Sequence, residues 1–382
     1  MRIGLLTDVY RPGFSGVANH VMLLKEGLKQ HGQQAFVFAF ERGQVVSGDP
    51  DVIYSPGVVL AADYPFGLRL SARASALLRT MDILHIHQPF ASGSAALHAA
   101  RQCRLPMLFT AHTRYDLYTK AYLPFLPYRF STFAIRAYMR VFSRRMALII
   151  APSTSMADLL RAWRVQAPVQ VIPNGINLQA FFPDAGSRAA LRRQLGLPEA
   201  ACIYLFVGRI ADEKNIDFLL SSFEMVCQRQ PQTALVLVGT GPKFRQVQAA
   251  VQAAGLNKKV IMTGRVPYEM VPDYMRAADV FVTASKTEVH PLTIIEAGAS
   301  SLPVVGLRAP GVTEAVLDGE TGFLCADNPP AFAEHMRTLA LKPDVRLTMG
   351  NHARRVSLAY SAESTTEQVL EQYQAVFARN HQ

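Results

Sequence analysis

Cysteine, long apolar runs and charge are all scarce in this sequence. Of its 382 residues, 18% are charged and only 4 are cysteines, which are widely spaced and form no Cys-x-x-Cys pair: Cys103, Cys202, Cys227 and Cys325. This spacing excludes a disulfide scaffold and favours a reducing compartment. No apolar run reaches the about 18–20 residues that span a bilayer, and the apolar stretch before Asp8 is too short for a secretory signal. We therefore expect a cytoplasmic protein with no membrane-spanning helix.

Two features are abundant: apolar residues throughout, and basic residues in the first half. Half of the residues are hydrophobic, which excludes disorder, and the length suits two or three domains. Residues 1–180 hold 19 basic and 9 acidic residues, whereas the remainder holds 20 of each, so the first half carries the whole net charge of +10. This asymmetry suggests a partner with an anionic surface, either a membrane or nucleic acid.

Short apolar strands alternate with helical segments along the chain. Residues 2–8 predict a strand, and residues 17–32 have helical periodicity that ends at Gly32. A stretch rich in Pro, Asn and Gly at 169–183 interrupts the alternation, which then resumes. We predict an α/β protein with two facing doubly wound Rossmann-like domains and a ligand site in the crevice between them. The other strands expected are 34–40, 82–88, 106–112, 146–153, 202–208, 233–239, 259–264, 279–285 and 302–307.

Two loops that follow predicted strands have the composition of anion-binding loops. In residues 12–16, glycine lets the backbone approach a ligand, and the helix after Gly16 offers free N–H groups; an ordinary turn would contain the same residues. After the strand 202–208, Arg209 and Lys214 flank a tight loop and could hold a diphosphate and neutralise a leaving group. Solvated surface charge is the alternative, although a lysine at a helix start is electrostatically unfavourable, which favours a function.

Two glutamates, Glu288 and Glu296, straddle the junction between a loop and a helix after the strand 279–285. On one continuous helix they would be about 80° apart, so they need not share a face. A glutamate in a first helical turn is by default capping chemistry, and a carboxylate there can equally accept two hydrogen bonds from a ribose diol. The residues by themselves leave both interpretations open.

Histidines also follow predicted strands. His112 lies at the end of the predicted strand 106–112, at the start of a loop. A loop histidine with satisfied hydrogen bonds is the ordinary interpretation, and a catalytic histidine is the alternative. His85 and His87 lie on one side of a strand, as metal ligands can. Because the sequence shows no third or fourth ligand near them, we expect no metal site.

In their order and spacing, the motifs together resemble the retaining glycosyltransferases of family 4, which have the GT-B architecture. The resemblance covers nearly the whole chain, and each motif alone is a weak signal. The segments that carry it are MRIGLLTDVYRPGFSGVANHV, HIHQPF, AHT, VIPNGIN, FVGRIADEKN, LVLVGTGP, TEVHPLTIIEAGASSLPVVG and GVTEAVLDGETGFL.

The resemblance implies roles for the charged residues. Arg209 and Lys214 would bind the diphosphate of a nucleotide-sugar and stabilise the departing charge. Glu296 would hold the ribose hydroxyls, and Glu288 would lie beside the transferred sugar. Such an enzyme mainly orients an activated donor, excludes water and stabilises the leaving diphosphate. Relatives of this kind retain anomeric configuration by front-face displacement, without a bound metal or cofactor, so we assign no nucleophile.

The resemblance also implies roles for less polar positions. Gly16 would let the first loop approach the diphosphate, His112 would lie near the reacting sugar from the opposite domain, and Pro291-Leu292-Thr293 would lie along the donor through its backbone. Two residues depart from the family pattern, because Ser15 and Pro291 stand where the family usually has glycine. Proline removes a backbone N–H that could have reached the donor, which puts donor placement in doubt.

Three structural parts are expected on the same grounds. Residues 1–173 form the acceptor-side, membrane-facing Rossmann-like domain, and residues 174–360 form the domain that binds the nucleotide-sugar. Residues 361–382 form a helix that packs back on the first domain.

One stretch that is rich in basic and aromatic residues indicates what kind of acceptor to expect. Between Asp116 and Asp158 there is no acid but there are six basic residues, four of which fall within about 80° on a helix. A basic face beside apolar aromatics suits anionic lipid, and a core helix with solvated arginines is the alternative. The residues assigned to the membrane or acceptor are Tyr115, Tyr118, Lys120, Arg129, Arg136, Arg140, Arg144 and Arg145.

This stretch also looks like the corresponding region of bacterial diacylglycerol glucosyltransferases. We therefore expect transfer of a hexose, with glucose from UDP-glucose as the first choice, to a lipid such as diacylglycerol at the inner face of the cell membrane. A soluble acceptor such as a sugar or sugar phosphate, or another lipid such as a phosphatidylinositol, is the alternative. A catalytically dead nucleotide-binding scaffold is the third reading. Nucleic acid is disfavoured because no nucleic-acid module accompanies the basic stretch.

Overall fold

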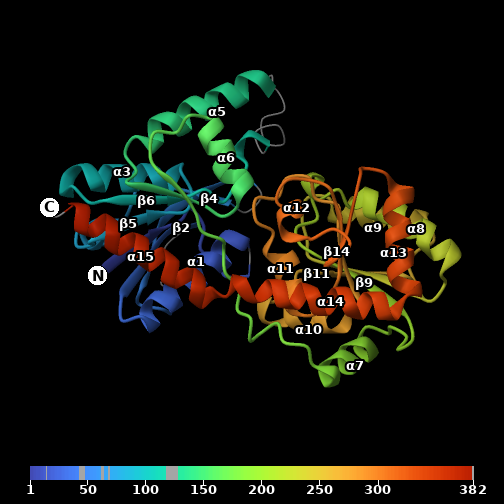
Figure 1. Cartoon of the computed structure of the whole chain (residues 1–382). Helices are drawn as coiled ribbons and strands as arrows, with labels where there is room; N and C mark the ends of the chain where they lie inside the picture. Colours follow the sequence, from blue (N-terminus) through green and yellow to red (C-terminus); the bar gives the residue numbers. More distant parts are fainter. Residues whose placement is uncertain (14, 43–47, 62–63, 68, 118–127, 381–382) are drawn as a thin grey trace. The chain divides into compact units, whose positions relative to one another are not determined.

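The chain forms two compact units, each with its own parallel sheet. The computed structural model describes residues 1–382 except 14, 43–47, 62–63, 68, 118–127 and 381–382. The first unit comprises Met1–Gly175 together with Ala362–Gln382, and the second comprises Ile176–Ser361. Figure 1 shows the chain coloured along its length, with the last helix, α15 (Ala362–Asn380), in red. The first and last segments of the chain thus fold together, as one unit.

In the described part of the first unit, eight strands lie in the order β4-β3-β2-β1-β5-β6-β7-β8. All neighbours are parallel except β3 and β4, which form an antiparallel edge. Strand order reverses between β1 and β5, which therefore define a topological switch point. The strands are β1 (Arg2–Leu6), β2 (Gln34–Arg42), β3 (Val52–Ala61), β4 (Tyr64–Phe66), β5 (Ile83–Ile86), β6 (Met107–Thr110), β7 (Leu148–Ala151) and β8 (Val169–Val171).

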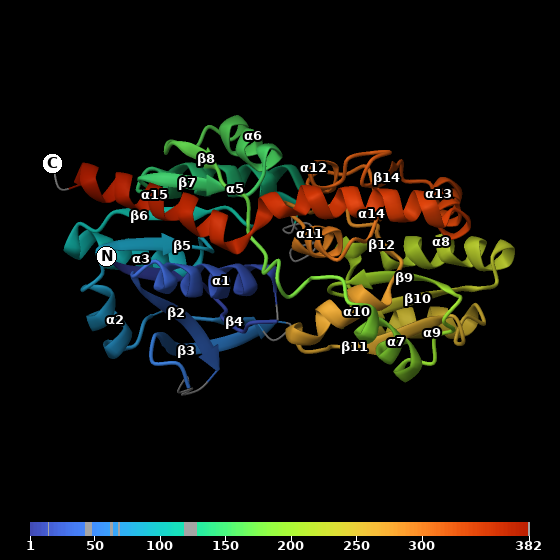
Figure 2. The same ribbon diagram turned by 60° about the horizontal axis from the view of Figure 1, so that its bottom comes forward.

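Helices cover both faces of this sheet (Figures 1 and 2). On one face, α1 and α15 pack on alternate residues of the strands, so that Leu24 and Val369 share a core with Leu5. On the other face, Phe142 of α5 meets Phe109 of β6 edge to face, with ring centroids 5.3 Å apart. The other helices of the unit are α1 (Gly16–Gln30), α2 (Ala72–Leu78), α3 (Ala91–Cys103), α5 (Tyr128–Ser143) and α6 (Thr154–Ala162).

The second unit repeats this plan with six strands in the order β11-β10-β9-β12-β13-β14, all parallel. Here the order reverses between β9 and β12, so a second switch point lies at their carboxyl ends. The strands are β9 (Cys202–Val207), β10 (Thr233–Val238), β11 (Val260–Gly264), β12 (Val280–Thr283), β13 (Val304–Leu307) and β14 (Gly322–Cys325).

Successive residues of these strands face opposite cores. Leu205 packs with α10 and α11, whereas Tyr204 and Phe206 pack with α8 and α13. Strands that are buried on both faces read as continuous apolar runs, as β9 and β10 do. The helices are α7 (Ala185–Gln194), α8 (Ile216–Arg229), α9 (Phe244–Ala253), α10 (Val271–Ala277), α11 (Leu292–Ala299), α12 (Val312–Ala315), α13 (Pro329–Leu341) and α14 (Pro343–Ser357).

A buried network of ion pairs fixes α7 to this sheet. Asp279, directly before β12, accepts hydrogen bonds of 2.6 Å from both Arg188 and Arg192 and one of 2.8 Å from the Ile203 backbone N–H. Arg192 is itself buried and donates to three backbone carbonyls. Every buried charge in this network is paired and hydrogen-bonded, because an unpaired charge would be too costly to bury.

The fold class predicted from the sequence is confirmed, because both units are parallel-sheet Rossmann-like domains. The sequence analysis did not anticipate β3, β4, β8 and β14. Pro56 and Gly57 interrupt the apolar pattern of β3, and β4 and β8 have only 3 residues each. Strand β14 begins with a glycine and leaves only three apolar residues, Phe323 to Cys325, as its signal.

Replacing Gly27 by alanine tests the packing of α15 on α1. A Cβ at Gly27 would lie 2.3 Å from Oγ1 of the buried Thr366, which is held by a hydrogen bond to the Ala362 carbonyl. We expect Gly27→Ala to destabilise the protein by about 1–3 kcal/mol, despite alanine's better helix propensity, because two tightly packed helices must separate. Urea unfolding measures the change. Gly48→Ala is the control, since a Cβ there meets nothing within 4 Å, and equal stability of both variants would contradict the contact.

Candidate functional site

At the switch point of the second unit, the loops after β9 and β10 are in close backbone contact. Ile210 donates its N–H to the Thr240 carbonyl at 3.0 Å and accepts from the Lys243 N–H at 3.1 Å. A Cβ at Gly239 would lie 1.9 Å from the Gly208 carbonyl oxygen, and one at Gly241 would lie 2.3 Å from that of Ile210. Only glycine fits at Gly239 and Gly241, so their role in the motif LVLVGTGP is to let the two loops approach each other.

The loop after β9 reaches the loop after β12 through an ion pair. Lys214, in a 3₁₀ turn at Asp212–Lys214, places Nζ 2.5 Å from Oε1 of Glu288. Burial by itself would raise the pKa of Glu288, but the charge and hydrogen bond of Lys214 and a hydrogen bond with Ser285 outweigh it, so the pKa lies below its ordinary value. The pair is therefore ionised at neutral pH. The structure thus brings together Lys214 and Glu288, whose predicted roles were separate.

Glu296 lies inside α11 and is only 2% exposed. Its Oε1 accepts a 2.6 Å hydrogen bond from the hydroxyl of Tyr268. Burial raises the pKa of Glu296 to about 7, and the bond from Tyr268 only partly opposes this. The carboxyl therefore changes charge near neutral pH. Tyr268 was not identified from the sequence, because an aromatic residue 28 positions away has no local signal that links it to Glu296.

The segment Pro291-Leu292-Thr293 forms the start of α11. Pro291 is the N-cap with φ −75°, and no side chain caps this helix end. The Ile294 N–H bonds to the Pro291 carbonyl. The N–H groups of Leu292 and Thr293 belong to the first turn of the helix, where N–H groups have no acceptor within the helix. Proline at the cap therefore leaves the first-turn donors in place. Arg209, the remaining charged candidate, is half-buried in the loop after β9.

In the first unit, Gly16 is the first residue of α1, and Ser15 is its N-cap. The Ser15 hydroxyl accepts a hydrogen bond from the Ala18 N–H at 3.2 Å. Serine is a favoured N-cap, which explains how this chain accommodates a residue other than glycine there. The left-handed backbone of the loop lies at Gly13, with φ 79°, whose N–H donates to the Asn19 side chain at 2.7 Å.

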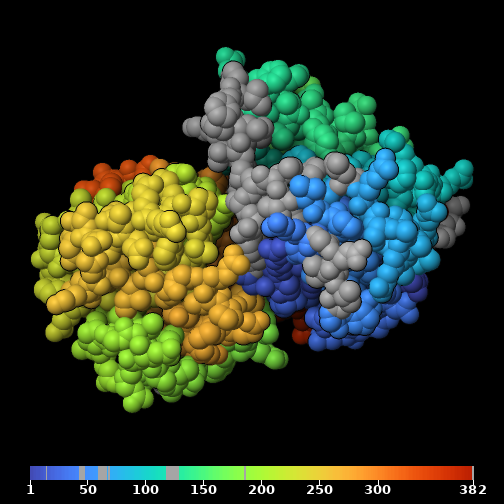
Figure 3. Space-filling view, turned by 180° about the vertical axis from the view of Figure 1, so that it is seen from behind, coloured from blue at the N-terminus to red at the C-terminus, as the bar shows by residue number. Residues whose placement is uncertain are grey.

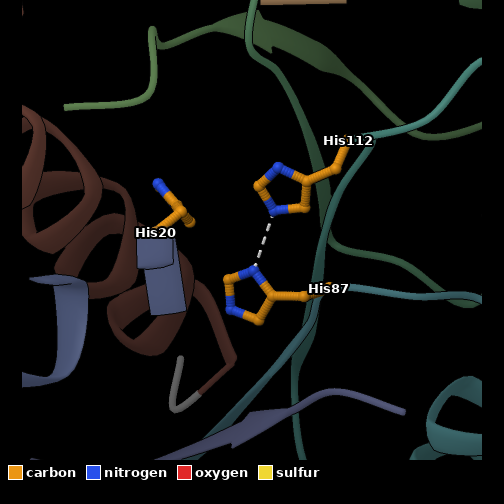
Figure 4. Close-up of side chains that lie close together, drawn as sticks. All are labelled: His20, His87 and His112. Atoms are coloured by element: carbon orange, nitrogen blue, oxygen red, sulfur yellow. Dashed lines mark hydrogen bonds between the residues drawn. The ribbon is translucent and has the colours of Figure 1, made fainter. Parts of the chain in front are cut away.

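His112 lies in a cluster with two other histidines, His87 and His20 (Figure 4). His87 Nδ1 and His112 Nε2 are 3.0 Å apart, and the two rings are nearly parallel, with centroids 5.3 Å apart. The His20 ring meets His112 edge-on at 4.9 Å. These residues follow β5, β6 and β1, whose carboxyl ends meet at one edge of the sheet. The sequence could not show this because the three lie in segments far apart.

The sequence shows no third ligand near His87, whereas the structure places two more histidines beside it. Ligand atoms of His20, His87 and His112 lie within 4.8 Å of one another, so these residues could hold a metal ion. His85 is engaged elsewhere, with Nδ1 2.6 Å from the Tyr373 hydroxyl and Nε2 2.7 Å from the Thr110 hydroxyl. Two nitrogens on a tetrahedral zinc would be about 3.3 Å apart. The 3.0 Å separation of His87 and His112 is that of a hydrogen-bonded pair.

The basic helix predicted for the acceptor is α5, and it has two apolar faces. Met139 and Phe142 point into the core, whereas Phe130, Phe133 and Val141 are 60%, 69% and 62% exposed. At 100° per residue the exposed apolar residues form one stripe on the side away from the core. Figure 3 shows this part of the chain, in teal-green, on the surface of its unit. On the same helical wheel Arg129, Arg136 and Arg140 line one border of the stripe, and Arg144 and Arg145 follow directly after the helix ends at Ser143; all five are exposed.

Two details qualify the basic stretch. Arg140 donates from Nε to the Trp163 carbonyl at 2.7 Å, so it also anchors α5 to α6. Tyr115 packs edge-on against Phe90 at 5.1 Å, next to the histidine cluster in sequence.

Tyr118 and Lys120 lie outside the described residues. No helix within the described ranges is long and apolar enough to cross a bilayer.

Two parallel-sheet Rossmann-like units are the architecture of the GT-B class of glycosyltransferases. The model for "Glycosyltransferase Family 4" matches residues 14–180, and that for "Glycosyl transferases group 1" matches 187–356. The chain belongs to the family 4 glycosyltransferases.

Relatives and solved structures agree with this assignment. The chain is 30% identical to the alpha-monoglucosyldiacylglycerol synthase of Acholeplasma laidlawii over 95% of its length and 94% of that protein's. It is 30% identical to the synthase of the same name from Streptococcus pneumoniae, over 100% and 88% of the two chains. In fold it is similar to Anabaena Alr3699/HepE, solved with UDP and glucose, with a TM-score of 0.80 at 20% identity over 98% and 99% of the chains.

Replacing Glu296 by glutamine tests the state of the buried carboxyl. The folded pKa of about 7 lies above the ordinary value of 4.5, so between these pH values the folded protein binds a proton that the unfolded chain releases. Stability is therefore lost as the pH rises toward 7 and above, by roughly 2–3 kcal/mol. We expect urea unfolding at pH 5 and pH 8 to show this loss in the wild type but not in Glu296→Gln. Equal pH dependence in both would contradict the raised pKa, and Glu269→Gln on the exposed side of the Tyr268 turn is the control.

Proposed function

We propose that this glycosyltransferase moves glucose from UDP-glucose to a membrane lipid of the diacylglycerol type, with retention of configuration and without a bound metal ion. Two relatives at 30% identity over most of both chains are named for the product of such a reaction. A structural neighbour binds UDP and glucose, which supports this donor. The observation on this chain that carries the lipid acceptor is the exposed apolar stripe of α5 with its arginine borders.

In this proposal Arg209 and Lys214 bind the donor's diphosphate. Two cations beside a leaving diphosphate stabilise the charge that develops as the glycosidic bond breaks. The contact between Lys214 and Glu288 is compatible with this role, because an ammonium has three donors and can keep one on Glu288. Glu288 thereby holds Lys214 extended in the loop after β9 and keeps its own carboxylate beside the transferred sugar.

Glu296 and the start of α11 would bind the remaining parts of the donor. A buried carboxylate accepts two hydrogen bonds from a ribose diol, and ribose hydroxyls would favour the ionised form of Glu296 over the neutral one. The first-turn N–H groups of Leu292 and Thr293 suit an electronegative donor group. Gly16 starts α1 at the corresponding helix end of the first unit. His112 would contribute to the site of the transferred sugar, and no residue is proposed as a covalent nucleophile.

The outer face of α5 is the proposed contact with the bilayer. Exposed phenylalanines would enter the boundary between headgroups and acyl chains, and the arginines would meet anionic headgroups. Each basic residue near an anionic surface contributes about 1 kcal/mol. The protein would then work as a peripheral protein on the cytoplasmic face of the membrane, where an acceptor dissolved in the bilayer is within reach.

A donor and acceptor panel tests the reaction. We expect nucleoside diphosphate release from UDP-glucose only when anionic liposomes with diacylglycerol are present, with a glucolipid formed and with the same rate in excess EDTA. Arg209→Ala should lower kcat by about 100-fold or more, because one stabilising donor to the leaving group is lost. The exposed Arg245→Ala on α9 is the matched control. Turnover with soluble acceptors alone would support the soluble-acceptor reading, and inactivity with every donor would support the dead scaffold.

Vesicle binding tests the outer face of α5. Phe130→Ser/Phe133→Ser should weaken sedimentation with both neutral and anionic vesicles by about 100-fold or more, since each buried phenylalanine contributes roughly 1.5–3 kcal/mol. Arg129→Ala/Arg136→Ala/Arg144→Ala should weaken it with anionic vesicles only, and high salt should remove that difference.

The matched control for this test is Leu341→Ser/Leu347→Ser, which removes two exposed leucines from α13 and α14 of the second unit. We expect it to leave vesicle binding unchanged. Equal losses in the control and in the α5 variants would contradict a membrane surface on α5.

A further inference from the structure

His87 occupies a rigid position next to His112. It directly follows β5, which pairs with β6, and His112 comes two residues after β6 ends. The His87 backbone N–H donates to the Leu6 carbonyl at 2.8 Å, and the side chain is fully buried. A side chain with a fixed position can fix the orientation of the group to which it is hydrogen-bonded. That neighbour is the His112 ring, whose plane is inclined by 21° to that of His87 and whose Nε2 faces Nδ1 of His87 (Figure 4).

The contact between the two rings requires one donor and one acceptor. A histidine ring carries at least one N–H, so the proton of His87 lies on Nδ1 or on Nε2. Nδ1 lies 3.0 Å from His112 Nε2, a normal hydrogen-bond distance. One of these two nitrogens therefore has the proton and the other offers its lone pair.

The surroundings of His87 decide which nitrogen is protonated. Its Nε2 is buried and has no hydrogen-bond partner among the described residues. A proton there would be a buried N–H without an acceptor, which is rarer and more costly than a bare lone pair. The proton therefore lies on Nδ1 of His87 and is donated to His112. Nε2 of His112 accepts it, and a neutral His112 carries its own proton on Nδ1.

We propose that His87 is a positioning residue that fixes the ring orientation and the tautomer of His112. The inference rests on the proposed catalytic role of His112. The hydrogen bond a histidine makes through one nitrogen sets what the other nitrogen presents, here an N–H donor at Nδ1. Without His87, His112 loses the hydrogen bond at Nε2 that selects its tautomer, and the fraction of rings with a proton on Nδ1 falls. His85, two residues earlier, has no such role because its two nitrogens bond to Tyr373 and Thr110.

Nitrogen NMR on the full-length protein tests the tautomer directly. In protein labelled with ¹⁵N-histidine, long-range proton–nitrogen spectra distinguish protonated from unprotonated ring nitrogens, and His112→Asn identifies the resonances of His112. We expect Nδ1 of His112 to be protonated and Nε2 to be an acceptor in the wild type, and an average of tautomers in His87→Ala. The opposite tautomer in the wild type, or an unchanged pattern in His87→Ala, would overturn the proposal.

Kinetics of matched variants separate positioning from stability. His87→Ala should lower kcat by about 10- to 100-fold with the KM for the donor nearly unchanged, because a displaced catalytic group costs rate rather than binding. His87→Asn keeps an amide donor near the place of Nδ1 and should restore most of the lost rate. Tyr373→Phe removes a buried hydrogen bond from the neighbouring His85 without touching His112, so it should lower stability and leave kcat unchanged.

Equal kcat losses in His87→Ala and Tyr373→Phe, or no recovery in His87→Asn, would overturn the positioning role. Failure of the proposed function gives a different result, namely no transfer by the wild type. In that case the tautomer of His112 in the nitrogen spectra still decides whether His87 fixes its neighbour.

Discussion

Parallel strand pairing is the constraint on which the arrangement of the candidate residues depends. When strands run in one direction, the loops at their carboxyl ends meet at one edge, and where strand order reverses two of these loops diverge and leave room for a ligand. In the second unit this happens between β9 and β12, and the ion pair of Lys214 with Glu288 spans that point. In the first unit it happens between β1 and β5, where His20 and His87 lie near each other. Glycines at 239 and 241 then allow neighbouring loops to touch.

The candidate residues differ in how their burial is compensated. Glu288 has a lysine beside it and stays ionised, whereas Glu296 has only the Tyr268 hydroxyl and so has a pKa of about 7. Asp279 shows the fully compensated case, with two arginines and a backbone N–H on one carboxylate. An uncompensated or half-compensated carboxyl is costly in a folded protein, and such groups concentrate at functional sites. This contrast sets Glu296 apart from the structural carboxylates of the same unit.

Helix α5 combines a structural and a surface role in one segment. Its inner residues, Met139 and Phe142, are part of the core, while its outer stripe leaves Phe130 and Phe133 in solvent. A helix packed on its own unit needs only one apolar face, so the second apolar face needs another explanation. The arginines at its borders give that face a charge opposite to that of anionic lipid. Part of the excess of basic residues in the first half of the chain thus lies along α5 and directly after it.

Local patterns in the sequence determined the fold class, the loops that carry the charged candidates and the basic character of α5. Apolar runs bounded by Gly, Pro and Asn are local features that predict the strands and their loops. The order of the motifs is specific to the glycosyltransferase family. Only the tertiary structure decided which side chains meet. Lys214 pairs with Glu288, 74 positions away, and Tyr268 contacts Glu296, 28 positions away. His20 of α1 and His112 of the loop after β6 both lie beside His87. Whether a carboxyl or an imidazole is charged depends on burial and on these partners, and neither is a local property of the sequence.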